Sequence, residues 1–233
     1  MSSSSPRVAG LLPVRKESVR CRNKMLRPFG DTTLVRLALE TISQSQELDV
    51  IYFAAHEEEF IEIAADFPRV QVIRRSRESA YGEDAPTIYD FMDAIEEPLI
   101  ASMNACCPFL RTETFDAAVR VFKAKGYNSV LAAIESGEWY WDEHGRPLNS
   151  TDPSIINSKM MPKVYRSGHA FLLFNKAEFL KDYRVWSLQP DDPHLFPIAP
   201  EEAIDINSEF EFDLAEAYYI SRVARGAFKS PLA

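Results

Sequence analysis

Short apolar runs alternate along most of the chain with longer segments of helical periodicity. The apolar runs, which are typical of strands buried on both faces of a sheet, lie at 8–14, 48–54, 70–73, 98–103, 129–134 and 163–174, the last with a bend at Ser167 and Gly168. The expected helices are one that begins at Asp31 or Thr32, with Leu34, Leu37, Ala38 and Ile42 on one face, and those at 56–67, 87–95, 113–125 and 209–225. This order predicts an α/β fold, a mostly parallel sheet with helices on both faces.

Three polar segments directly follow expected strands. They are the loop 15–24, His56, and the segment 104–108. In open parallel sheets, ligands bind in the crevice beyond the carboxyl ends of the strands. We therefore expect these three segments to converge on one binding site.

The loop 15–24 concentrates basic residues. It contains Arg15, Lys16, Arg20, Arg22 and Lys24, with Ser18 among them and Glu17 as its one acid. In a protein of net charge −9, this clustering indicates a site for an anion such as a polyphosphate; a solvated basic loop is the alternative. The loop lacks glycine, so it is neither a Walker A motif nor a dinucleotide-binding fingerprint.

The composition sets the class of protein. A chain of 233 residues is expected to form one domain, here 8–225, between a disordered tail at 1–7 and a second tail at 226–233. The 35 acidic residues outnumber the 26 Lys and Arg residues, which argues against a general nucleic-acid-binding protein. No apolar stretch approaches the length of about 20 residues that spans a membrane. The three cysteines do not form a disulfide framework, and the cytoplasm is the expected compartment.

The alternating pattern stops at Glu138. The segment 138–165 begins with Trp139, Tyr140 and Trp141 and shows no clear helix or strand period. It is interpreted as a lid, a β-hairpin or a subunit contact. For the three aromatic residues, packing or a dimer contact is favoured over stacking on a base.

Four motifs in order resemble the acylneuraminate cytidylyltransferase family, which includes the CMP-sialic acid and CMP-Kdo synthetases. The similar positions are Arg15, Ser18, Arg20 and Lys24, followed by Leu-Arg-Pro-Phe-Gly at 26–30; Asn-Ala-Cys-Cys-Pro-Phe-Leu-Arg at 104–111; Pro162, Tyr165, Gly168, Ala170 and Phe171; and Ala-Ile-Asp-Ile-Asn at 203–207, followed by Asp-Leu-Ala-Glu at 213–216. The resemblance covers about residues 8–220. Each motif alone is weakly specific, whereas all four in the same order are strongly so.

The resemblance implies a Rossmann-like, GT-A-like nucleotidyltransferase fold with a small dimerisation insertion at 138–165. It implies transfer of CMP from CTP to an acidic acceptor, with release of pyrophosphate. It also implies catalytic roles for Arg15, Lys24 and Asp205, with Ser18 and Arg20 as further nucleotide contacts. Asp205, with Asn207, would bind Mg²⁺, and Asn104 would contact the substrate. A homodimer is expected, because the matching insertion of the family reaches across one.

Some residues depart from the family pattern. Lys16 and Glu17 stand where the family loop usually has glycine, and Glu17 would repel a triphosphate unless it points away or pairs with a cation. Asn207 replaces a second acid. We therefore expect an acceptor such as a sialic acid-, Kdo- or legionaminic-like sugar or a phosphonate. The alternatives are a nucleotidyltransferase that uses another NTP, and a weakened homologue that serves as a binding or assembly subunit.

Further candidate residues each have a second interpretation. Arg75, His169 and Tyr165 are candidate acceptor contacts; solvation is the alternative for Arg75 and its neighbours Arg74 and Arg77, and core packing the alternative for His169. His56 either touches the ligand or caps a helix. Cys106 and Cys107 are interpreted as buried small residues rather than metal ligands, because the chain has no second cysteine pair.

Overall fold

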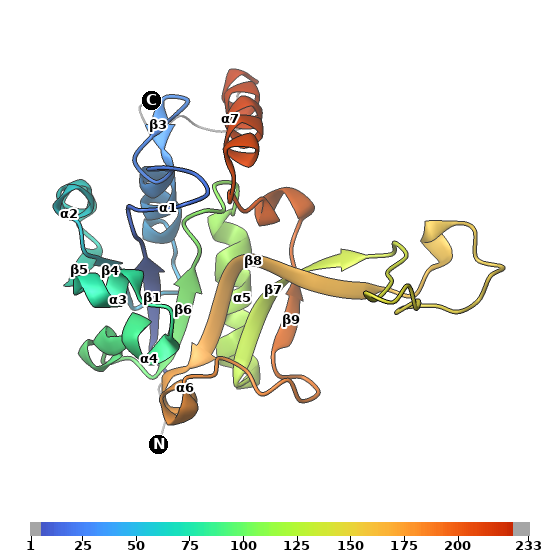
Figure 1. Ribbon diagram of the computed structural model, residues 1–233. Coiled ribbons are helices and arrows are strands. Elements are labelled where there is room, and N and C mark those ends of the chain that lie inside the picture. The colour runs from blue at the N-terminus through green and yellow to red at the C-terminus, as the bar shows by residue number, and fades with distance from the viewer. Residues whose placement is uncertain (1–5, 226–233) are drawn as a thin grey trace.

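The computed structural model, which describes residues 6–225, has a central seven-stranded sheet with the order β5-β4-β1-β6-β8-β7-β9 (Figure 1). The strands are β1 (Val8–Pro13), β4 (Val50–Ala55), β5 (Val70–Arg74), β6 (Leu99–Met103), β7 (Ser129–Ser136), β8 (Val164–Asn175) and β9 (His194–Pro197). β1 pairs in parallel with β4 and β6, and β8 is antiparallel to both β6 and β7. The predicted mostly parallel α/β fold is confirmed, with β8 as the reversed strand.

Helices cover both faces of this sheet. They are α1 (Leu34–Ser43), α2 (Glu58–Ala64), α3 (Arg77–Tyr81), α4 (Ala85–Ile88), α5 (Thr112–Lys125) and α6 (Lys176–Asp182). The last helix, α7 (Glu209–Ala224), lies beyond the carboxyl ends of the strands (Figure 1), where its Phe212 and Tyr219 pack on Phe29. The N-cap of α1 is Thr33, whose hydroxyl accepts a hydrogen bond from the backbone N–H of Arg36 at 3.4 Å. The expectation of Asp31 or Thr32 as the cap was therefore wrong by one or two positions, because Thr32 and Thr33 form a short strand first.

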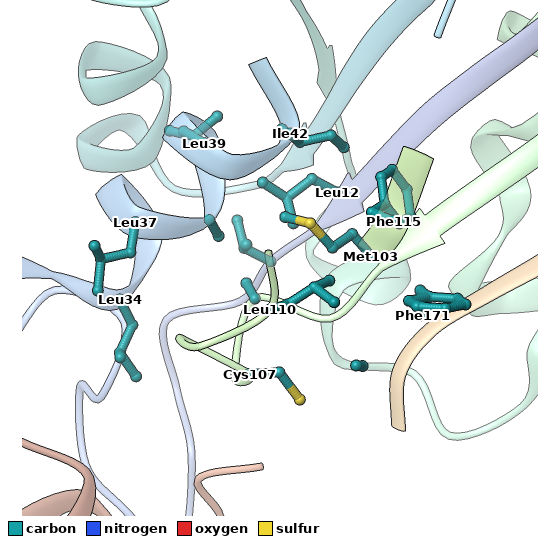
Figure 2. Packing of buried hydrophobic residues seen from close by; sticks show 14 of the residues in the cluster. Leu12, Leu34, Leu37, Leu39, Ile42, Met103, Cys107, Leu110, Phe115 and Phe171 are labelled. Atoms are coloured by element: carbon teal, nitrogen blue, oxygen red, sulfur yellow. The ribbon is translucent and has the colours of Figure 1, made fainter. Parts of the chain in front are cut away.

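The core consists of two apolar layers, one on each face of the sheet. The larger layer holds the buried faces of α1, α2, α5 and α7. Figure 2 shows part of it, where Leu12 of β1, Ile42 of α1, Met103 of β6 and Phe115 of α5 lie together. Burial of each large apolar side chain contributes about 1.5–3 kcal/mol relative to exposure. The smaller layer, which includes Phe174, packs against α6 and the segment before β6.

The expected helix at 87–95 is wrong as one element. The short helix α4 ends at Ile88, near the start of this segment, and a separate 3₁₀ helix, η1 (Asp90–Ala94), occupies the rest. Asp84 caps α4 by accepting from the N–H of Thr87 at 3.0 Å. Tyr89, at φ −110° and ψ 26°, separates α4 from η1. Local capping therefore divides a stretch whose apolar spacing alone suggests a continuous helix.

Several elements were not expected from the sequence. A hairpin of β2 (Pro28–Phe29) and β3 (Thr32–Thr33) turns at Gly30, whose φ of 61° suits glycine. α6, β9 and the 3₁₀ turns η2 (Ser158–Met160) and η3 (Pro200–Ala203) also lie outside the expected elements. Each is short, so the period of its side chains carries little signal.

The segment between β7 and β8, residues 137–163, extends away from the sheet as an arm (Figure 1). It contains an isolated antiparallel bridge between Trp141 and Pro147. Around this bridge the N–H of Leu148 donates to the Tyr140 carbonyl at 2.8 Å and the N–H of Asp142 donates to the Arg146 carbonyl at 2.9 Å. Residues 140–148 therefore form a short hairpin-like turn, and the β-hairpin interpretation applies to this part of the arm alone. Four of its large apolar side chains are exposed, namely Trp141, Leu148, Ile156 and Met160.

The two expected tails lie largely outside the described residues. Within the expected N-terminal tail, Arg7 is described and forms an ion pair with Glu97 at 3.0 Å. Residues 226–233 lie outside. Within residues 6–225, no helix combines the length and the apolar composition that crossing a membrane requires.

Candidate active site

A cavity of about 560 Å³ lies at the carboxyl ends of β1 and β6. Three segments that are distant in sequence form it. The lining residues are Pro13, Val14, Arg15, Ser18, Val19, Arg20, Lys24 and Met25 of the first segment, Asn104, Ala105 and Cys106 of the second, and Asp205 and Asn207 of the third. The structure thus brings together the loop after the first strand and the segment 104–106, as expected for the ends of neighbouring parallel strands. His56, the third segment expected there, does not line the cavity.

Hydrogen bonds join the three segments. The backbone N–H of Ile206 donates to the carbonyl of Cys106 at 3.0 Å. Lys24 Nζ donates to the Ile206 carbonyl at 2.5 Å, and Asn104 Nδ2 donates to Asp205 Oδ1 at 3.4 Å. Lys24 is only 9% exposed, so it is a buried cation whose ammonium group also fixes the turn that carries Asp205.

The cavity is positively charged. Arg15, Arg20 and Lys24 line it, against the single carboxylate of Asp205. Arg20 Nη2 donates to Asn207 Oδ1 at 2.9 Å, whereas Arg15 is exposed and has no hydrogen-bond partner among residues 6–225. A concave site with excess cations, one of them free of internal partners, suits an anionic ligand.

Glu17 does not line this cavity. Its side chain is exposed, and the neighbouring Lys16 forms an ion pair with Glu59 of α2. The hydrogen bond and charge of Glu59 raise the pKa of Lys16, while the same contact lowers the pKa of Glu59. The pair holds Lys16 toward α2, and the predicted conflict between Glu17 and a triphosphate is therefore relieved by its position.

The two adjacent cysteines occupy different environments. Cys106 lines the cavity together with Lys24, whereas Cys107 is buried. Burial raises the pKa of both thiols, and the charge of Asp205 raises the pKa of Cys107 further. Both therefore remain neutral thiols at neutral pH, which disfavours a role as metal ligands.

Asp205 and Asn207 are the candidate ligands for Mg²⁺. In the part of the chain that is described, no three His, Cys, Asp or Glu side chains form a group that could hold a metal ion. Mg²⁺ is commonly held by one or two carboxylates, with substrate phosphates and water completing its coordination. The Asp205 carboxylate lines the cavity beside the cations, so this donor set fits Mg²⁺ that arrives with a polyphosphate.

Arg75 lies outside the cavity lining. It is 7% exposed, and it donates hydrogen bonds to the carbonyls of Ser79 and of Ile88, the latter at 3.2 Å. Burial lowers its pKa, and its guanidinium stacks 5.3 Å from the centroid of the Phe91 ring. Its donors therefore hold the α3–α4 segment.

The other acceptor candidates lie on β8 or beside β4. Tyr165 and His169 of β8 are exposed and do not line the cavity, and Tyr165 Oη donates to Glu135 Oε2 at 3.0 Å. His169 has a φ of 55° and precedes Ala170, whose carbonyl accepts from the N–H of Asn104 at 2.9 Å. His56 does not cap α2: Glu57 holds the N-cap position, and His56 Nδ1 lies 3.1 Å from the Arg75 carbonyl oxygen.

One ion pair near the site was missed in the sequence. Arg111 donates to buried Glu202 through Nε at 3.0 Å, Nη2 at 3.1 Å and its backbone N–H at 3.1 Å. Glu202 lies in η3, directly before the turn that carries Asp205. Arg111 ends the motif at 104–111, and Glu202 directly precedes the motif at 203–207. Nothing in the spacing of the two motifs indicates that these residues pair.

Comparison with family models gives one match that covers most of the chain. A family model described as "Cytidylyltransferase" matches residues 9–215. A search of curated proteins finds no match.

Solved structures share the fold at low sequence identity. A CMP:2-keto-3-deoxy-manno-octonic acid synthetase complexed with CTP has a TM-score of 0.67 and 10% identity, over 93% of this chain and 99% of that one. A 4-diphosphocytidyl-2C-methyl-D-erythritol synthase from Anaerococcus prevotii DSM 20548 has a TM-score of 0.65 and 14% identity, over 93% and 97%. A cytidylyltransferase from Leptospira borgpetersenii serovar Hardjo-bovis has a TM-score of 0.59 and 16% identity, over 91% and 86%. These similarities show a nucleotidyltransferase-like α/β fold.

Proposed function

The chain belongs to the cytidylyltransferase family, and we propose that it transfers CMP from CTP to a small acidic acceptor with release of pyrophosphate. The observation that carries this proposal is the cavity at the ends of β1 and β6, where Arg15, Arg20 and Lys24 surround one carboxylate. Such a charge distribution suits a nucleoside triphosphate better than an apolar ligand.

The side chains fit the requirements of phosphoryl transfer. An oxygen of the acceptor attacks the α-phosphorus of CTP, and the bond from this phosphorus to the oxygen that bridges to the β-phosphate breaks, so that pyrophosphate leaves. Arg15 and Lys24 offset the negative charge on the phosphates, and Ser18 adds a hydrogen bond. This type of transfer depends on positioning and charge neutralisation more than on covalent catalysis.

Asp205 is the proposed protein ligand of Mg²⁺, with the side-chain oxygen of Asn207 beside it. The ion supplies further neutralisation of the phosphates when it is bound. Asn207 already accepts a hydrogen bond from Arg20. Arg20 therefore keeps the amide oriented, with its nitrogen donating to the Asp205 carbonyl at 3.2 Å.

The acceptor is proposed to be an acidic sugar, of the sialic acid, Kdo or legionaminic acid type, or a phosphonate. Of the structures above, one is named as a synthetase for a CMP-linked octonic acid and another as a synthase for a diphosphocytidyl methylerythritol. Asn104 lines the cavity. His169 directly precedes Ala170, whose carbonyl accepts a hydrogen bond from the N–H of Asn104. These two residues, with Tyr165 farther along β8, are the proposed acceptor side of the site.

A homodimer in the cytoplasm is also proposed. The arm exposes Ile156 and Met160 to 90% and 71%, and aromatic and Met side chains are enriched in the cores of interfaces. Cys21, Cys106 and Cys107 are free, as is typical of a reducing compartment.

Thermal shifts with the four nucleoside triphosphates test the nucleotide assignment. CTP with Mg²⁺ should raise the melting temperature more than ATP, GTP or UTP at equal concentration, because a ligand that binds only the folded state stabilises it. Chelation of Mg²⁺ should reduce the shift. Equal shifts with all four nucleotides would favour a nucleotidyltransferase without base selection. If CTP binds but no pyrophosphate is released with any acidic acceptor tested, the chain would be a binding subunit rather than an enzyme.

A further inference from the structure

The middle of the nucleotide loop is held by two residues that do not line the cavity. The N–H of Glu17 donates to Tyr81 Oη at 3.2 Å, and the N–H of Lys16 donates to Glu57 Oε1 at 3.4 Å. Tyr81 Oη in turn donates to the same Glu57 oxygen. We call Glu57 and Tyr81 the loop clamp, since together they bind two successive backbone amides of the loop.

The clamp is anchored in well-defined structure. Glu57 follows β4 at the N-cap position of α2, where its side chain makes no capping hydrogen bond. Tyr81 is the last residue of α3, the helix that Arg75 holds through the Ser79 carbonyl. Burial, together with the hydrogen bond to Glu57, raises the pKa of Tyr81, so the phenol keeps the proton that it donates.

The two oxygens of the Glu57 carboxylate differ in their contacts. Glu57 Oε2 is buried and has no hydrogen-bond partner among residues 6–225. A buried carboxylate oxygen without a partner destabilises a fold. The other oxygen, Oε1, accepts from both the N–H of Lys16 and the hydroxyl of Tyr81, so the hydrogen bonds of this carboxylate go to the loop and to the second clamp residue.

Lys16 and Glu17 lie between Arg15 and Ser18, both of which line the cavity. Fixing the two central amides restricts the backbone from which Arg15 and Ser18 project. With the Lys16–Glu59 ion pair, the clamp also keeps the side chain of Lys16 toward α2. The two central residues of a loop without glycine are in this way bound by contacts from the N-terminal end of α2 and from α3.

We propose that Glu57 and Tyr81 are positioning residues that order the nucleotide loop before the triphosphate binds and so set its affinity. This inference rests on the proposed function, because it assumes a nucleoside triphosphate in the cavity. A loop that is ordered in advance binds without a further loss of conformational entropy. If the loop is ordered in only a fraction of the molecules, the apparent affinity for the ligand is reduced to that fraction of its full value.

The first test compares Tyr81→Phe with a matched control. Loss of the hydroxyl should raise the Kd for CTP with Mg²⁺, measured by calorimetry, by about 3- to 10-fold, the range that corresponds to one hydrogen bond. Tyr52→Phe removes an equivalent contact, since Tyr52 Oη donates to Glu97 Oε2 at 3.3 Å and Tyr52 does not line the cavity. The control should bind CTP as the wild type does. Equal Kd values for Tyr81→Phe and wild type would overturn the proposal.

Two variants of Glu57 separate positioning from simple charge. If Glu57 acted only as a nearby negative charge, Glu57→Ala and Glu57→Gln would both strengthen the binding of a triphosphate. The clamp predicts that Glu57→Ala weakens it, while Glu57→Gln, which keeps an acceptor oxygen, restores most of the affinity. Tighter binding by Glu57→Ala would contradict the proposal.

Hydrogen exchange tests the clamp without any nucleotide. The amides of Lys16 and Glu17 should exchange faster in Tyr81→Phe and Glu57→Ala than in wild type or Tyr52→Phe, with melting temperatures recorded for each variant. Unchanged exchange overturns the clamp even if CTP binds. Faster exchange in a protein whose wild type does not bind CTP supports the clamp and overturns the proposed function. Should Tyr81→Phe fail to fold, the two Glu57 variants provide the same comparison.

Discussion

Arg15 and Lys24 both belong to the basic loop, yet they are held in different ways. Arg15 is exposed and has no hydrogen-bond partner among residues 6–225. Lys24 is buried, with its ammonium on the Ile206 carbonyl. The first is free to bind a ligand, whereas the second also holds the Asp205 turn in place.

Arg15→Ala is the cleaner test of the phosphate assignment. It should weaken CTP binding by about 10- to 100-fold, the range for one hydrogen bond that involves a charged group, with little change in melting temperature. Arg22→Ala is the matched control, because Arg22 is exposed on the same loop but does not line the cavity. Lys24→Ala should weaken binding at least as much and should also lower the melting temperature. If Arg15→Ala and Arg22→Ala bind CTP equally well, Arg15 is not part of the phosphate site.

At the residue scale, the sequence could predict those positions that follow directly from strand ends. Arg15, Ser18, Lys24 and Asn104 come just after β1 and β6, and the structure places them in one cavity. The position of Arg75 could not be predicted, since its burial depends on the α3–α4 segment that folds over it. The clamp residue Tyr81 gave no signal either, because it meets the loop only through the tertiary packing of a short helix.

At the element scale, β1, β4 and β6 were predicted because buried parallel strands are continuous apolar runs. β5 was predicted at the right place, but it is the edge strand and is largely exposed rather than buried on both faces. The long helices α5 and α7 were also predicted, since their apolar stripes persist over several turns. Short elements such as α4 and β9 depend instead on caps and on pairing with distant strands. Their boundaries are decided by contacts that one segment of sequence does not contain.

The turn η3 provides a prediction at this scale, because Glu202 joins it to the start of α5. Burial alone would raise the pKa of Glu202, but the hydrogen bonds from Arg111 outweigh it and lower the pKa. Arg111 is 60% exposed, so solvent screens part of this pair. Glu202→Gln should reduce the free energy of unfolding by about 1–2 kcal/mol, whereas Glu201→Gln, at an exposed neighbour, should have little effect.

The pH dependence checks the same contact. A carboxyl with a lowered pKa stabilises the fold above its unfolded pKa, and that contribution is lost as the pH falls through the folded value. The stability difference between wild type and Glu202→Gln, measured by denaturant unfolding, should thus be constant near neutral pH and shrink below the ordinary glutamate pKa of 4.5. A difference that grows on acidification would contradict the ionised pair.

At the scale of the whole molecule, the arm and α7 are two places within residues 6–225 where several large apolar side chains are exposed. The arm presents Ile156 and Met160, and α7 presents Phe210 and Leu214. The arm projects from the sheet (Figure 1), so it buries little of itself within one subunit. An isologous contact between two arms would cover these side chains in both subunits at once.

Light scattering with selected variants decides between a dimer through the arm and its alternatives. The wild type should have about twice the monomer mass of 26.5 kDa at micromolar concentration, with or without CTP. Ile156→Asp should shift it toward the monomer, since a charge in an apolar interface loses hydration without gaining a partner. Leu214→Asp, an equivalent change on α7, should leave the mass unchanged. If Leu214→Asp dissociates the dimer and Ile156→Asp does not, α7 is the interface; a wild type that is monomeric under both conditions leaves the arm as a lid that acts within one subunit.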